Sequence, residues 1–184
     1  MAGRMSSPWL RWGLVAVLQL ALIAMPLAER WSVHLTGTEV TLALRPVDPR
    51  DLLRGDYVIL NPEIERLSRA DLGDTMPGLS EGDRVWTVVA PDEDGVWRAD
   101  AVLTMPPEDG RVALAGRVSG LSGADIVRVD YGLNAFFVPQ GKGKAIEAMP
   151  REDVRLVVAV TADGRSSALR LMADGVVLLR ETAF

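Results

Sequence analysis

The sequence predicts a mainly β protein, in which an N-terminal transmembrane helix precedes an antiparallel β sandwich or small barrel with one or two short helices. Two observations predict this class. An uncharged apolar run lies near the N-terminus, and four Asp-Gly dipeptides separate apolar segments in the rest of the chain. We therefore expect two parts: a membrane anchor or uncleaved signal segment over residues 1–30, and an extracytoplasmic β domain over residues 31–184.

The apolar run covers residues 12–28, WGLVAVLQLALIAMPLA, and basic residues precede it at Arg4 and Arg11. A transmembrane helix needs about 17–25 apolar residues, whereas the apolar part of a signal peptide needs about 7–15. Trp12 and Trp31 bracket the run, as tryptophans do at the two interfaces of a bilayer. These features favour a retained anchor in contact with the lipid bilayer. A cleaved signal peptide stays open as the alternative, although Pro26 is unfavourable for cleavage after Ala28.

Composition excludes several classes of function. The chain has no cysteine and a single histidine, His34, so neither a thiolate metal site nor a multi-histidine site can form within one chain. We expect no metal and no cofactor. The net charge of −5 argues against binding to nucleic acid. Residues 31–184 carry 17 basic and 24 acidic side chains, which suits a domain outside the cytoplasmic membrane.

The strands follow from the turn signals. Asp94-Gly95, Asp109-Gly110, Asp163-Gly164 and Asp174-Gly175 lie between apolar runs, and Asp-Gly there predicts a hairpin turn whose two residues both have positive φ. The last three strands are expected to form a meander, because residues 165–172 alternate between two faces. The expected strands cover residues 40–46, 57–60, 84–90, 96–104, 111–118, 126–138, 154–160, 165–172 and 176–181.

Helix signals in the β domain are few. Residues 62–72, PEIERLSRADL, predict one helix with Asn61 as N-cap and Pro62 at the first helical position. A second short helix is expected over residues 144–149, KAIEAM, after Gly143.

The stretch RPVDPRDLLRGDYVIL, residues 45–60, has more charges than a turn needs. It predicts a strand, one helical turn that begins at Asp48-Pro49 and ends at Gly55, and a second strand. A purely structural role accounts for the turn residues, and a binding surface accounts for the charges. Both interpretations stay open. The candidate partner- or ligand-binding residues here are Asp48, Arg50, Arg54, Asp56 and Tyr57.

A second candidate surface lies in YGLNAFFVPQGKGKAIE, residues 131–147. Phe136 and Phe137 are consecutive, so one of the two rings faces outward in a strand. Lys142 and Lys144 are the only lysines of the chain, and they alternate with glycines in a loop whose N–H groups suit an anion. A flexible turn is the alternative. The loop lacks the pattern of a nucleotide-binding P-loop.

These two blocks resemble a known family. GDYVILNP matches the signature of the GDYXXLXY family at Gly55, Asp56, Tyr57 and Leu60, but Pro62 stands where the family has its last tyrosine. The second block, residues 131–147, also resembles these proteins, and the resemblance covers about residues 10–172. It implies a single-pass protein of the bacterial cytoplasmic membrane with its C-terminal domain in the periplasm. It also implies a polytopic membrane protein as partner and no established biochemical activity.

We expect no catalytic residue. RGDYVIL is similar to a segment of signal peptidases, but no Ser-x-x-Pro precedes it and both lysines lie far downstream. The function expected from the sequence is therefore an accessory module that docks on a membrane or envelope partner. An envelope hydrolase that uses carboxylates or a serine, or a domain that binds an anionic ligand through Lys142 and Lys144, is the alternative.

Overall fold

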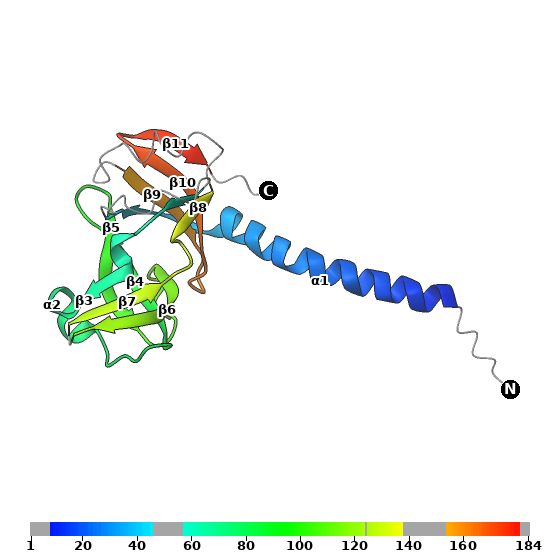
Figure 1. Ribbon diagram of the computed structural model, residues 1–184, viewed down its shortest axis with the longest axis horizontal. Helices are drawn as coiled ribbons and strands as arrows, with labels where there is room; N and C mark the ends of the chain where they lie inside the picture. The colour runs from blue at the N-terminus through cyan, green and yellow to red at the C-terminus, as the bar shows by residue number, and fades with distance from the viewer. Residues whose placement is uncertain (1–7, 46–56, 124, 138–153, 181–184) are drawn as a thin grey trace.

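A helix and a β body make up the protein. The computed structural model describes residues 8–45, 57–123, 125–137 and 154–180. The helix α1 (Pro8–Thr36) projects from the body as one rod (Figure 1). Helix α1 contacts the body at β9 and β10, and Val33 near its C-terminal end is buried. Gly37 then joins α1 to the first strand, and a Cβ at this position would lie 2.6 Å from the Val33 carbonyl oxygen.

Nine strands of the described residues form one mixed sheet in the order β11-β10-β9-β1-β5-β4-β6-β7-β3. All neighbouring pairs are antiparallel except β1 and β5, which are parallel and meet at Leu42 and Trp97. The expectation of a mainly β fold is confirmed, but that of a purely antiparallel one is wrong. The strands are β1 (Thr38–Ala43), β3 (Arg66–Ser68), β4 (Arg84–Pro91), β5 (Trp97–Leu103), β6 (Ala113–Ser122), β7 (Ile126–Asp130), β9 (Val154–Val160), β10 (Ser166–Ala173) and β11 (Val176–Arg180).

One hydrophobic core joins the two halves of this sheet. Its fully buried side chains include Val40 and Leu42 from β1, Leu156 from β9, Leu114 from β6 and Val129 from β7. Strands from both sides of the parallel contact therefore bury their side chains together. Removal of this apolar area from water stabilises the fold at about 25 cal/mol per Å².

A second, smaller cluster lies around Trp86 in β4. The Trp86 indole nitrogen donates to the Asp163 carbonyl oxygen at 3.2 Å, and the Ala115 N–H donates to the Gly164 carbonyl oxygen at 2.8 Å. Gly164 has φ 89°, and a Cβ there would lie 2.8 Å from the indole ring. The turn between β9 and β10 therefore packs across β4 and β6, and only glycine fits against the ring.

All four Asp-Gly dipeptides lie between consecutive strands, as predicted, but the expected turn type holds at one of them. Asp174 and Gly175 both have positive φ, at 48° and 77°. In the other three dipeptides only the glycine does. At Gly95 and Gly164 the loops have three residues, in which one left-handed glycine follows a type I turn. The alternation predicted for residues 165–172 also fails, because a bulge between Ala168 and Arg170 lets both Ala168 and Leu171 point inward.

The helix expected over residues 62–72 is divided into short elements. A 3₁₀ turn, η1 (Glu63–Glu65), leads into β3, and α2 (Arg69–Leu72) and the 3₁₀ turn η2 (Gly73–Thr75) follow. Strand β3 pairs with β7, and this pairing interrupts the helix. Pro62 rather than Asn61 is the residue that precedes η1. The expectation of one or two short helices is confirmed, and the helix expected over residues 144–149 lies outside the described residues.

Many apolar side chains of α1 are exposed. Trp12 is 72% exposed, Leu18 62% and Leu22 64%. Within the part of the chain that the structure describes, no helix combines the length and the apolar character needed to cross a membrane. The transmembrane helix expected over residues 12–28 is therefore not confirmed.

Candidate functional site

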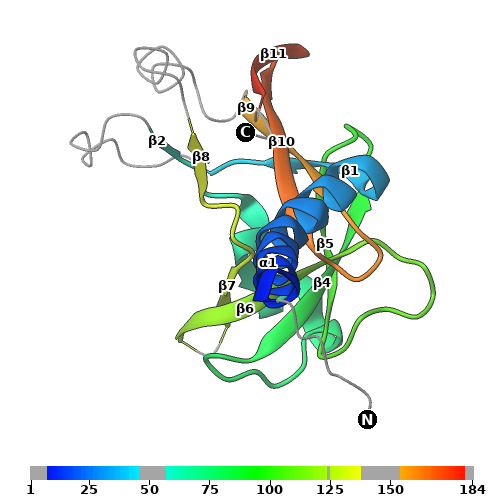
Figure 2. The same cartoon turned by 90° about the vertical axis from the view of Figure 1, so that its right-hand side faces the viewer.

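The two sequence blocks singled out above meet in a short ribbon. Strand β2 (Tyr57–Ile59) pairs antiparallel with β8 (Ala135–Phe137), and Tyr57 is the register partner of Phe137. Figure 2 shows the two strands beside the main sheet and apart from it. Their register brings Tyr57, Phe136 and Phe137 together, and this pairing of the two blocks was not predicted from the sequence.

The other predicted site residues lie in two segments on either side of the ribbon in the sequence. Asp48, Arg50, Arg54 and Asp56 belong to residues 46–56, and Lys142 and Lys144 belong to residues 138–153, and both segments lie outside the described residues. Residues 46–56 are followed by Tyr57, and residues 138–153 are preceded by Phe137. Tyr57 and Phe137 are register partners, so both segments connect to the same end of the ribbon.

A polar groove of about 580 Å³ lies where the ribbon joins the main sheet. Backbone hydrogen bonds form this junction: the Arg45 N–H donates to the Asn61 carbonyl oxygen at 2.8 Å, and the Leu60 N–H donates to that of Asn134 at 3.0 Å. Three arginines, Arg45, Arg66 and Arg128, line the groove. Arg66 and Arg128 are direct cross-strand partners. The lining residues are Arg45, Asn61, Pro62, Glu65, Arg66, Ser119, Arg128, Val129, Asp130 and Asn134.

Glu65 is the titratable group of the groove with the most perturbed environment. Its Oε1 atom is buried without a hydrogen-bond partner among the described residues. Burial, and then the negative charge of Asp130, raise the pKa of Glu65 to about 7. Near neutral pH this side chain is therefore divided between a carboxylate and a neutral acid that can donate a hydrogen bond.

Beneath Glu65, a buried pair of hydroxyl groups fixes the backbone. The hydroxyl groups of Thr87 and Tyr131 lie 2.6 Å apart, and the Tyr131 hydroxyl donates to the Ile64 carbonyl oxygen at 3.2 Å. Burial raises the pKa of Tyr131 above its usual value, so it stays a neutral donor. Since Ile64 precedes Glu65, these bonds hold the turn that presents Glu65 to the groove.

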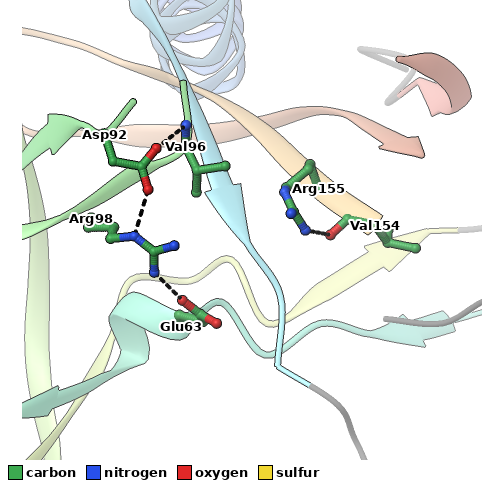
Figure 3. Close-up of polar contacts among 6 residues, drawn as sticks. All are labelled: Glu63, Asp92, Val96, Arg98, Val154 and Arg155. Carbon is green, nitrogen blue, oxygen red and sulfur yellow. Dashed lines mark hydrogen bonds and ion pairs between the residues drawn. The ribbon is translucent and has the colours of Figure 1, made fainter. Parts of the chain in front are cut away.

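A surface ion network holds the same turn from outside. Arg98 of β5 donates to Glu63 at 3.1 Å and to Asp92 at 2.8 Å (Figure 3). The hydrogen bond from Arg98 lowers the pKa of Asp92. Figure 3 also shows Arg155, which donates to the Val154 carbonyl oxygen at 3.3 Å. The Arg98 contacts join η1 to the turn between β4 and β5.

Replacement of Glu65 by glutamine is expected to flatten the dependence of stability on pH. Because the pKa of Glu65 is raised from 4.5 to about 7, its contribution to stability is full below pH 4.5 and is lost as pH rises through 7. The shift corresponds to about 3 kcal/mol at full burial, and to about 1–2 kcal/mol once partial solvent access is considered. Urea unfolding of full-length Glu65→Gln from pH 4.5 to 8 tests this.

The matched control for that series is Glu81→Gln, since Glu81 is exposed on a turn. The control should keep the slope of the unmodified protein. If Glu65→Gln keeps that slope too, Glu65 titrates in the folded protein as it does in the unfolded chain.

The described residues contain no cluster of histidine, aspartate and glutamate that could hold a metal ion. The groove is instead lined by three guanidinium groups, two side-chain amides and the Glu65 carboxyl group, whose raised pKa makes it easily protonated. This set suits the binding of an oxyanion. Glu65, Arg66 and Arg128 were not anticipated from the sequence, because Glu65 and Arg66 lay in an expected helix and Arg128 in a strand with no visible partner.

The fold and site define a β domain with an N-terminal helix and a ribbon built from two separate sequence blocks. The GDYXXLXY protein family matches residues 19–171, and the chain belongs to this family. The comparison confirms the resemblance drawn from the two blocks. Searches among curated proteins and among solved structures find no match.

Proposed function

We propose that this protein is a membrane-anchored accessory module whose periplasmic β domain docks on a polytopic membrane protein through the β2–β8 ribbon. The pairing of Tyr57 with Phe137 carries the proposal, because it joins two separate blocks in one element outside the main sheet. Among the described residues, the outer edges of this ribbon are unpaired. Such edges can take an additional strand from a partner.

The uncharged apolar run within α1 motivates the membrane part of the proposal, although no described helix combines the length and apolar character needed to cross a membrane. The 29 residues of α1 span about 43 Å at 1.5 Å per residue, more than the roughly 30 Å hydrocarbon core. Residues 12–28 carry no charge, and the described apolar side chains between Trp9 and Met25 are exposed. An exposed apolar surface of this extent is costly in water and favourable in lipid. Arg4 and Arg11 precede the uncharged run, and basic residues on that side favour an orientation with the β domain outside the cytoplasm.

Tyr57→Ala and Asp56→Ala are expected to reduce the recovery of a partner at least fivefold while the melting temperature changes little. Such a change in recovery corresponds to about 1 kcal/mol of lost contact. Tagged full-length protein is purified from native membranes in mild detergent, and the proteins that accompany it are quantified by mass spectrometry.

Leu121→Ala serves as control, because Leu121 is an exposed apolar residue of β6 outside the ribbon. Full recovery is expected with this variant. Unchanged recovery with Tyr57→Ala would contradict docking at the ribbon, and a large fall in melting temperature would instead assign Tyr57 a structural role.

A further inference from the structure

Two arginines of the groove have an arrangement that is electrostatically unfavourable. Arg66 of β3 and Arg128 of β7 are directly opposite each other, and like charges in cross-strand positions repel. Both are exposed, and within the described residues neither forms a side-chain hydrogen bond or an ion pair. Other arginines of the β body do have acidic partners, as Arg98 and Arg170 show.

A third arginine and two amides complete the groove. Arg45 lies at the end of β1, and its side chain has no acidic partner among the described residues. Asn61 and Asn134 follow β2 and precede β8, and their amide groups can donate hydrogen bonds to an oxyanion. Three guanidinium groups and two amides therefore line one concavity.

The acidic residues of the groove do not cancel this charge. Asp130 accepts a hydrogen bond from the Gly132 N–H at 2.8 Å. Glu65 is half-buried, and its pKa of about 7 leaves it largely neutral below that pH. Asp130 and Tyr131 interact electrostatically with Glu65, and the three arginines line the same groove. With three arginines against one ionised carboxylate, the groove is net positive in weakly acidic conditions.

We infer that this groove binds a small polar molecule through a phosphate or carboxylate group held between Arg66 and Arg128. Guanidinium groups bind the oxygens of such anions in bidentate fashion, and an anion between the two arginines would remove their repulsion. A volume of about 580 Å³ lies in the range of small-molecule sites. The inference goes beyond the docking function and does not depend on it.

The test uses purified full-length protein in a neutral detergent at low ionic strength. Glucose 6-phosphate and gluconate are the probes, glucose is the uncharged control, and sodium chloride at matched ionic strength controls for screening. Binding is measured by calorimetry and by the melting temperature, which a ligand of the folded state raises. We expect one or both anions to bind, glucose and chloride to have no effect, and the stronger anion to identify the phosphate or carboxylate preference.

Two single variants, their double variant and one control locate the site. Arg66→Gln and Arg128→Gln should each weaken binding at least threefold, and the double variant at least tenfold. Arg180→Gln should bind as the unmodified protein does, because β11 and β3 form opposite edges of the sheet. The melting temperature of the free protein should stay the same or rise in Arg128→Gln, since a repulsion is removed; a purely structural arginine would lower it.

Gluconate binding also tests the contribution of Glu65. The carboxylate of gluconate stays ionised between pH 6 and pH 8, so a change of affinity over this range reports on the protein. Gluconate should bind more tightly at pH 6 than at pH 8, and Glu65→Gln should remove this difference. The inference is overturned if neither anion binds, or if binding is equal in the double variant and in Arg180→Gln.

Discussion

If α1 anchors the protein in a membrane, as proposed, a chain that carries both Leu18→Arg and Leu22→Arg is expected to leave the membrane fraction. The two positions are one helical turn apart and share a face of α1. An arginine near the centre of a membrane helix costs about 2.5–3.5 kcal/mol each on insertion scales, in addition to the lost leucine contribution. The expected result is a change from almost complete sedimentation with membranes to recovery mainly in the soluble fraction, measured after carbonate extraction.

Leu121→Arg is the control for this experiment. Leu121 is 51% exposed, comparable to Leu18, but it lies in β6 of the β body. The control should remain with the membranes. Retention of the double variant in the membrane fraction would show that α1 is not the anchor.

Gly116→Ala is expected to destabilise the β body by about 1–3 kcal/mol. A Cβ at Gly116 would lie 2.5 Å from Val129 Cγ1 and 2.8 Å from Tyr131 Cδ1. Val129 is a stiff β-branched side chain, and the Tyr131 ring is fixed by the hydrogen bonds of its hydroxyl group. Neither neighbour can move without cost, so urea unfolding should show a lower midpoint.

Gly120→Ala provides the comparison on the same strand. Nothing lies within 4 Å of a Cβ at Gly120, and its φ is not in the left-handed region. Its unfolding midpoint should differ little from that of the unmodified protein. Equal destabilisation by both substitutions would mean that β6 does not pack on Tyr131 as described.

Sequence reasoning located most strands because apolar alternation and Asp-Gly turns are local signals. Strands β4, β5, β9 and β11 begin and end close to their expected positions. Local signals do not specify which strands become neighbours. The parallel contact of β1 with β5, and the pairing of β2 with β8, join segments that are far apart in the chain.

Because local signals do not specify strand neighbours, sequence reasoning also missed the residues of the groove. Residues 62–72 have local helix signals, and pairing of β3 with β7 overrides them. Arg66 and Arg128 therefore become neighbours only through the order of strands in the sheet. Glu65 gains its raised pKa from burial and from Asp130, and neither cause is visible in the residues next to it.

The two binding surfaces predicted from residues 45–60 and 131–147 are only partly described by the structure. Tyr57, Phe136 and Phe137 are brought together by the ribbon, while the predicted aspartates, arginines and lysines lie outside the described residues. Their part in binding stays a prediction. The convergence of the two blocks is nevertheless the feature that the docking proposal uses.

Site-specific photo-crosslinking in intact cells tests the docking proposal most directly. A photoreactive amino acid is placed at position 57 or 137 of the ribbon, and at position 121 as control. The proposal predicts one discrete adduct with a polytopic membrane protein from both ribbon positions and none from position 121. No adduct from the ribbon, or the same adducts from all three positions, would contradict it.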